Sequence, residues 1–165
     1  MMNVDHILQV LYDHQVDYLL IGGMNFLLNH KPELTFDLDI WVEDKPENLS
    51  TLNLALRDLE AAWGKTEEAW KPVSEDPSWL QAQTLFCLTS RHGALDIFRK
   101  VLGLDNPFRE SKARATLQKT SAGTLYWSLS DADMLRCQLA LPLAEQKPLR
   151  IQTLQAALLK KDYGS

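Results

Sequence analysis

The sequence predicts an α/β fold, in which helices pack against a mixed β-sheet and further helices follow at the C-terminal end. Short apolar runs of strand length recur along the chain, and amphipathic stretches at helical spacing stand between them. The length of 165 residues suits one domain. We therefore expect 1–165 to form a single domain, with a core of about 1–102 and a C-terminal helical segment of about 129–161.

Helices and strands alternate in the first part of the chain. Val4, Ile7 and Leu11 recur on one helix face, and Gly64 follows a second such stripe as a helix stop. The expected elements are a helix over 3–14, a strand over 17–21, a short helix over 24–29, a strand over 36–42, a helix over 47–63 and two strands over 83–89 and 94–101.

The rest of the chain is less regular until its helical end. Residues 65–80 are polar and contain two prolines, so we expect an irregular excursion or a weak strand. The pattern over 103–120 favours neither helix nor strand. The remaining expected elements are a strand over 123–127, a helix that Ser130 caps and that ends near Pro142, and a helix over 149–160.

Composition excludes two broad classes. The hydrophobic content of 45% is too high for a disordered chain, and no apolar run approaches the roughly 20 residues of a membrane helix. Residues 1–6 lack the basic head and apolar stretch of a signal peptide.

Cys87 and Cys137 stand far apart among apolar neighbours, without metal-ligand spacing, so we interpret them as reduced core thiols of a cytoplasmic protein.

Charge is unevenly distributed. The net charge of −5 argues against general nucleic-acid binding. Residues 91–119, however, carry seven Lys or Arg against three Asp or Glu. This segment either faces phosphates or forms a solvated loop and helix face.

Two carboxylates share one face of the strand over 36–42. Leu38 and Ile40 alternate with Asp37 and Asp39, and side chains two residues apart point to the same side of a strand. The acidic pair is about 7 Å apart at the Cα atoms. Like charges this close destabilise the fold unless a cation or hydrogen-bond donors intervene, and Mg²⁺ prefers such oxygens. The other interpretation is a solvent-facing side of a half-buried strand.

Two further features gain meaning beside this strand. Gly22-Gly23 stands between a strand and a short helix, where glycine lets the backbone approach a ligand and the helix start suits a phosphate. Asp96 alternates with Leu95 and Ile97 in a later strand. If that strand lies beside 36–42, Asp96 joins the two carboxylates on one face.

This order of Gly22-Gly23, Asp37-Leu38-Asp39 and a later strand Asp96 resembles the nucleotidyltransferase superfamily related to polymerase β. The stretch 20–42 is most similar to small prokaryotic members, several of which belong to toxin–antitoxin and abortive-infection systems. Pro32 and Thr35 match their loop before the paired carboxylates. The stretch 129–135 is similar to the start of their C-terminal helical segment.

The resemblance implies a nucleotidyltransferase-like fold and a metal-dependent enzyme. Such an enzyme transfers a nucleoside monophosphate from an NTP to a hydroxyl of RNA, a protein or a small molecule. The implied catalytic residues and ligands of Mg²⁺ or Mn²⁺ are Asp37, Asp39 and Asp96, of which Asp96 also helps to activate the attacking hydroxyl. The implied nucleotide-binding residues are Gly22, Gly23, Asn25 and Thr35.

The sequence departs from the family pattern at several positions. Glu33 stands where the family often has Arg, Met24 follows the glycines where small residues are common, and Gln138 stands where Lys is common. Lys147 and Arg150 match the family's later basic run only loosely. A second hypothesis is therefore a non-catalytic relative, a nucleotide- or partner-binding module such as a toxin–antitoxin component. A third is a nucleic-acid binder that uses 91–119.

Other candidates have two interpretations each. His30 and His92 are expected in loops near the carboxylates, but no Ser-His-Asp order and no zinc spacing emerges. Trp41 shares its face with the Asp pair, and Phe98 shares one with Asp96. Each either stacks on a base or packs beneath a helix.

Overall fold

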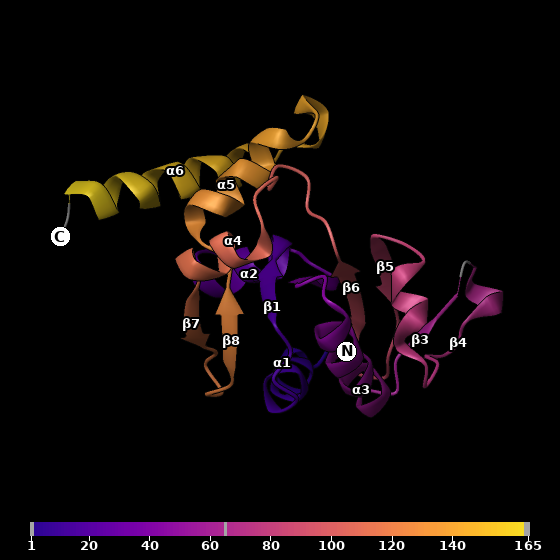
Figure 1. Cartoon of the computed structure of the whole chain (residues 1–165). Helices are drawn as coiled ribbons and strands as arrows, with labels where there is room; N and C mark the ends of the chain where they lie inside the picture. The colour runs from indigo at the N-terminus through magenta and orange to yellow at the C-terminus, as the bar shows by residue number, and fades with distance from the viewer. Residues whose placement is uncertain (1, 65, 164–165) are drawn as a thin grey trace.

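A six-stranded mixed sheet forms the centre of the computed structural model, which describes residues 2–64 and 66–163 (Figure 1). The strands lie in the order β5-β6-β2-β1-β8-β7. Their bounds are β1 (Tyr18–Ile21), β2 (Asp37–Val42), β5 (Leu85–Leu88), β6 (Ala94–Phe98), β7 (Thr116–Lys119) and β8 (Leu125–Ser128). Strand β2 pairs antiparallel with β1 and parallel with β6, so the expected mixed sheet is confirmed.

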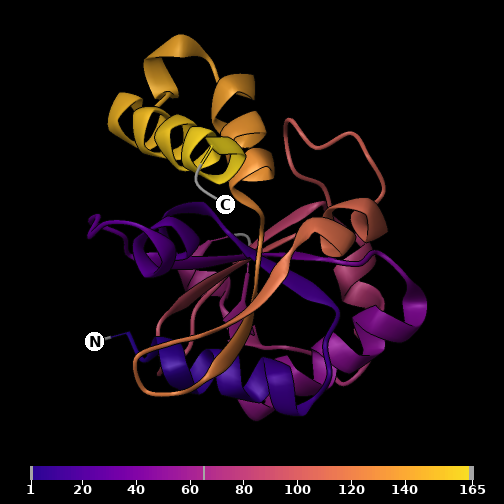
Figure 2. The ribbon, with the colours of Figure 1, turned by 90° about the vertical axis from the view of Figure 1, so that its left-hand side faces the viewer.

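Helices cover both faces of this sheet (Figure 2). They are α1 (Val4–Asp13), α2 (Gly22–Asn29), α3 (Pro46–Asp58), α4 (Phe108–Arg114), α5 (Asp131–Ala140) and α6 (Pro148–Tyr163). Figure 2 shows α1 and α3 on one side of the sheet and the pair α5 and α6 on the other. The result is a layered α/β fold.

The apolar side of β2 forms the larger core. Leu38 and Ile40 are fully buried and belong to one cluster with Leu8 of α1 and Leu52 of α3. Because strand side chains alternate, the same strand presents its odd-numbered residues to the opposite face. Strand β2 is therefore anchored from below by the packing of α1 and α3.

The opposite face carries a second, smaller core. Ile21 and Trp41 of the sheet pack with Phe108 of α4, Met134 of α5 and Leu154 of α6. This core covers only part of the face. The first half of β2 and the middle of β6 carry the acidic residues instead.

The start of α5 agrees with the capping prediction. The Ser130 hydroxyl accepts a hydrogen bond from the Asp133 backbone N–H at 3.1 Å. The buried Asp133 carboxylate in turn forms ion pairs with Arg114 and Arg136. Helix α5 is thereby fixed to α4 at its first turn.

The expected end of the helix over 47–63 was wrong. The helix expected over 47–63 ends at Asp58, because Glu60 takes a positive φ of 54° and the chain turns there. Residues Ala62–Trp63 instead form a short strand, β3, paired with β4 (Lys71–Pro72). Trp63 packs against the ring of Trp79 rather than lying on a helix stripe.

The helix expected over 24–29 begins earlier, at Gly22, so the glycine pair forms its first turn. The polar stretch contains β4 and two 3-10 helices, η1 (Glu67–Ala69) and η2 (Pro77–Gln81), as an irregular excursion would; a third, η3 (Leu143–Glu145), precedes α6. The undecided segment 103–120 forms α4 and β7.

Cys87 was expected in the core, and this was wrong. Its side chain is exposed on β5, while Cys137 is partly buried. Phe86 and Leu88 take the buried positions of β5, so alternation turns Cys87 to the other face. Within the described residues, no helix has the length and apolar character needed to cross a membrane.

Candidate active site

Asp39 and Asp96 lie directly opposite each other on neighbouring strands. Strands β2 and β6 run parallel in register, which pairs Asp39 with Asp96 and Asp37 with Ala94. The adjacency of strands on which the interpretation of Asp96 depended is therefore confirmed. All three carboxylates extend from the face of the sheet that α5 and α6 partly cover.

Burial and mutual repulsion both act on these three residues, which we call the acidic group. Burial, followed by the charge of Asp96, a hydrogen bond with it and the charge of Asp37, raises the pKa of Asp39 to about 7, and the positive charge of Arg150 acts in the opposite direction. Burial and then the charge of Asp37 raise the pKa of Asp96 as well. A cation among these groups would relieve the repulsion.

Cys87 is a neighbour of the acidic group that sequence reasoning missed. It lies opposite Asp96 in the antiparallel pairing of β5 with β6. Although the residue is exposed, partial burial of its thiol raises the pKa to about 11, and the charges of Asp96, Asp37 and Asp39 act in the same direction. The alternation of Phe86 and Leu88 with Cys87 was the signal that could have placed the thiol on this face.

Gly22 leaves room for Asp39. Its φ is +68°, and a Cβ atom built on it would lie 2.6 Å from Asp39 Oδ2. Any other residue at this position would both strain the backbone and displace the carboxylate. The sequence therefore places glycine where the start of α2 comes closest to the acidic group.

Gly23 is covered by two residues of the loop before β2. A Cβ atom on Gly23 would lie 3.2 Å from Thr35 Oγ1 and 3.3 Å from Glu33 Oε1. The Thr35 hydroxyl also donates a hydrogen bond to the Asp37 carbonyl oxygen at 3.2 Å. The predicted nucleotide-binding residues Gly22, Gly23 and Thr35 thus lie together beside the acidic group.

An ion-pair cluster joins that loop to the start of α6. The Glu33 carboxylate accepts hydrogen bonds from the Arg150 guanidinium, one of them at 3.2 Å, and from Lys147 Nζ at 3.0 Å. Although burial acts to raise it, these two cations hold the pKa of Glu33 below its usual range. Glu33, the residue that departs from the family pattern, therefore has dedicated partners.

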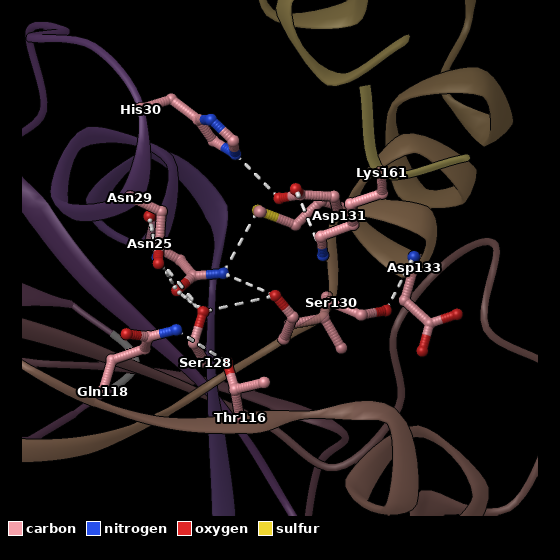
Figure 3. A network of polar contacts seen from close by, with 12 residues as sticks. Asn25, Asn29, His30, Thr116, Gln118, Ser128, Ser130, Asp131, Asp133 and Lys161 are labelled. Atoms are coloured by element: carbon pink, nitrogen blue, oxygen red, sulfur yellow. Dashed lines mark hydrogen bonds and ion pairs between the residues drawn. The ribbon is translucent and has the colours of Figure 1, made fainter. Parts of the chain in front are cut away.

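Asn25 lies in a buried polar network rather than at an open surface (Figure 3). Its amide N–H group donates to the Leu129 carbonyl oxygen at 3.2 Å, and its carbonyl oxygen accepts from Ser128 Oγ at 2.8 Å and from Asn29 at 2.9 Å. The network ties α2 to β8 and to the start of α5. A nucleotide could contact the Asn25 side chain only after these bonds opened.

A mostly apolar cavity of about 220 Å³ adjoins Gly22. Ile21 and Phe98 line it from the sheet, and Met134 lines it from α5. Its polar lining comes from Gln138, which is 5% exposed, and Arg150, which is 8% exposed. The cavity is large enough for part of a small organic ligand beside the acidic group.

The acidic group fits a divalent cation in donor type and charge. Carboxylate oxygens are the ligands that Mg²⁺ prefers, and Asp39 Oδ1 is buried without a hydrogen-bond partner. Among residues 2–64 and 66–163, no group of three or more His, Cys, Asp and Glu side chains stands ready to hold a metal ion. The carboxylates are therefore suitable ligands for a metal ion, but within the described residues they are not already arranged as a complete ligand set.

The remaining candidates have structural partners. His30 Nε2 lies 2.7 Å from Asp131 Oδ1 (Figure 3), and the His92 ring lies against the His6 ring. Trp41 is buried and packs edge-on against Phe108, which agrees with packing beneath a helix. In 91–119, several arginines pair with acidic side chains of other segments; these arginines are Arg91, Arg99, Arg109 and Arg114.

The mixed sheet, its covering helices and the adjoining C-terminal helices are those of the nucleotidyltransferase fold. A Thermotoga maritima protein described as a nucleotidyltransferase superposes with a TM-score of 0.54 at 17% sequence identity, covering 98% of this chain and 94% of that chain. The crystal structure of ANT(2'')-Ia in complex with adenylyl-2''-tobramycin superposes with a TM-score of 0.55 at 12% identity, covering 94% and 85%.

The solution structure of ANT(2'')-Ia, an antibiotic-resistance factor, superposes with a TM-score of 0.52 at 11% identity, covering 94% of this chain and 80% of that chain. No protein-family model and no curated protein matches the sequence. At these identities the likeness establishes the fold, and it confirms the fold that the sequence resemblance implied.

Proposed function

We propose that this protein is a nucleotidyltransferase that moves a nucleoside monophosphate from an NTP to a hydroxyl acceptor. The observation that carries the proposal is the position of Asp39 opposite Asp96 on one face of a nucleotidyltransferase fold. Gly22, which leaves space for Asp39, supports it, because nucleotide phosphates could approach the backbone there. The three carboxylates of the acidic group repel one another, and a bound cation would relieve this repulsion.

The reaction forms a bond between the acceptor oxygen and the α-phosphorus of the NTP. The bond from that phosphorus to the oxygen bridging to the β-phosphorus breaks, and pyrophosphate leaves. Asp96 receives the acceptor proton, a role that its raised pKa favours at neutral pH. Asp37 and Asp39, with Asp96 completing the site, would hold Mg²⁺ or Mn²⁺, which would supply charge neutralisation at the phosphates.

The acceptor hydroxyl of the proposed reaction belongs to RNA, a protein or a small molecule. ANT(2'')-Ia was crystallised with an adenylylated small molecule, adenylyl-2''-tobramycin. A small-molecule hydroxyl therefore stands beside RNA and protein hydroxyls as an acceptor for this chain. The apolar cavity beside Gly22 offers space for a ligand with apolar character on the side that Met134 lines.

The test is a transfer assay with wild-type protein and two variants. Protein, Mg²⁺ or Mn²⁺, α-labelled NTPs and cell extract are incubated, and labelled acceptors are separated. Asp37→Asn removes one charge of the acidic group, and we expect at least about a hundredfold loss, the scale on which one electrostatic stabiliser contributes. Asp58→Asn alters an exposed carboxylate on α3 that pairs with His14, and we expect full labelling. Equal labelling by Asp37→Asn and wild type would refute the catalytic assignment.

A second candidate function is binding without turnover. Two observations favour it: Glu33 covers Gly23, and the described residues hold no complete ligand cage for a metal. In that case the chain would be a nucleotide- or partner-binding module, such as a cytoplasmic toxin–antitoxin component. Calorimetry with NTP and Mn²⁺ separates the candidates, because tight binding without labelled product supports the module.

A further inference from the structure

Glu33 places a negative charge over the glycine pair. Its Oε1 atom lies 3.3 Å from where a Cβ on Gly23 would be, so the carboxylate is in contact range of the α2 backbone. Thr35 Oγ1 lies on the same side at 3.2 Å. An anion of this chain therefore already occupies the space through which a phosphate would reach Gly23.

Two cations hold this anion in place. The Arg150 guanidinium contacts both Glu33 oxygens, and Lys147 Nζ lies 3.0 Å from Oε1. Arg150 is only 8% exposed, and its guanidinium also lies over the Phe26 ring at 5.4 Å. Such a buried, pre-oriented guanidinium fork binds carboxylate and phosphate oxygens with the same geometry.

Arg150 also belongs to the candidate active site. It lines the cavity beside Gly22, and its charge acts on Asp39. The acidic group thus lies beside Gly22, and Glu33 with its two cations lies beside Gly23. A polyphosphate lying between them would meet metal-binding carboxylates at one end and Arg150 with Lys147 at the other.

We propose that Glu33 is an internal substitute for substrate phosphate, and that triphosphate binding exchanges Glu33 for phosphate oxygens on Arg150 and Lys147. This inference rests on the proposed nucleotidyltransferase function. Glu33 carries its charge at neutral pH, since its cationic partners keep its pKa low. If Glu33 stayed in place, a phosphate at Gly23 would lie in contact with a like charge, which opposes binding strongly in a half-buried site.

The exchange has a structural consequence. Glu33 belongs to the loop between α2 and β2, whereas Lys147 and Arg150 stand at the start of α6. The ion-pair cluster is thus a tie between that loop and the C-terminal helices. Displacing Glu33 releases the loop from α6, so phosphate affinity and loop release are two readouts of one event.

The experiment uses inorganic tripolyphosphate without metal, and compares wild-type protein with Glu33→Gln. Calorimetry measures affinity. We expect Glu33→Gln to bind about tenfold more tightly or better, because the competing charge is gone while the side-chain shape remains. Lys147→Ala in the Glu33→Gln background should lose much of that gain. Glu75→Gln, which alters an exposed carboxylate paired with Arg57, should bind as wild type does.

Removing Glu33 leaves Arg150 buried without its partner, so stability is followed separately. Tripolyphosphate should raise the unfolding temperature of Glu33→Gln more than that of the wild type, since it replaces the lost anion. Equal affinity and equal stabilisation in the two proteins would overturn the exchange. So would an undiminished gain in the variant that also lacks Lys147.

A failure of the phosphate exchange can be told apart from a failure of the proposed function. Tripolyphosphate has no nucleoside to transfer, and its binding is measured without metal or turnover. Tighter binding by Glu33→Gln with no nucleotidyl transfer by wild type would leave the phosphate exchange standing and remove the enzyme proposal. Transfer by wild type with no effect of Glu33→Gln would do the reverse.

Discussion

Asp39 fills the space that a side chain on Gly22 would need. The distance from Asp39 Oδ2 to a Cβ built on Gly22 is 2.6 Å, shorter than any contact that two such atoms sustain. The start of α2 and the acidic strand β2 are therefore matched to each other at this point. Glycine here serves the carboxylate directly, in addition to its positive φ of +68°.

Gly22→Ala is expected to displace the Asp39 carboxylate. The strain of a Cβ at positive φ lowers stability by about 1–2 kcal/mol, and the clash additionally weakens Mn²⁺ binding and nucleotidyl transfer. Gly123→Ala is the matched control, because Gly123 has φ +90° with no atom within 4 Å of its Cβ position. Urea unfolding should show a loss of stability in both variants, and a Mn²⁺ titration should show a loss only in Gly22→Ala. Wild-type Mn²⁺ affinity in Gly22→Ala would contradict this account.

The stability of the metal-free protein should depend on the protonation of Asp39. Its pKa is 3.8 ordinarily and about 7 in the fold. Between these values the folded protein keeps a proton that the unfolded chain has released, so rising pH favours unfolding in this window and has no further effect above it. Each unit by which the pKa is raised is worth at most about 1.4 kcal/mol.

Asp39→Asn removes this pH-dependent loss. In a chelating buffer we expect the variant to be more stable than wild type at pH 8, with the difference shrinking as the pH falls toward 4. Urea unfolding at several pH values measures it, with Asp58→Asn as the control for an exposed carboxylate. A variant less stable than wild type at pH 8 would show that Asp39 is not under repulsion.

Asn25→Ala tests whether the buried network or the nucleotide is the partner of Asn25. Removing its amide takes one buried hydrogen bond each from Ser128 and Asn29, and we expect a loss of about 1–3 kcal/mol, or several degrees in unfolding temperature. NTP affinity below the transition should stay near the wild-type value. Gln118→Ala, an exposed change, should leave both quantities unaltered. Intact stability with lost NTP affinity would favour direct nucleotide contact instead.

Local pattern was enough to predict the parts of the fold that carry the site. Period-two alternation over Asp37–Val42 assigned Leu38 and Ile40 to the core and the two carboxylates to the other face. The same alternation in β6 gave the phase of Asp96. The sequence did not predict that β6 pairs with β2, and the role of Asp96 depended on that pairing. Local pattern cannot predict it, because the choice of neighbouring strands in a sheet depends on contacts between residues far apart in sequence.

Two of the features that sequence reasoning missed depend on long-range contacts. Trp63 continued an apolar helix stripe in the sequence, but its packing with Trp79 and the turn at Glu60 overrode that local pattern. Glu33 and Arg150 are separated by most of the chain, so no spacing rule could have paired them. Glu33 departs from the family pattern, and in the structure it forms a specific ion pair with Arg150.

The most direct test of the account measures free Mn²⁺ by electron paramagnetic resonance, with an ATP analogue that carries a methylene bridge between its α- and β-phosphorus atoms. If Asp37, Asp39 and Asp96 form one cation site, wild-type protein removes Mn²⁺–nucleotide from solution, and Asp39→Asn and Asp96→Asn each weaken this by about tenfold or more. Asp58→Asn should bind as wild type does. Wild-type affinity in both site variants, or no Mn²⁺–nucleotide binding by the wild type, would contradict the account.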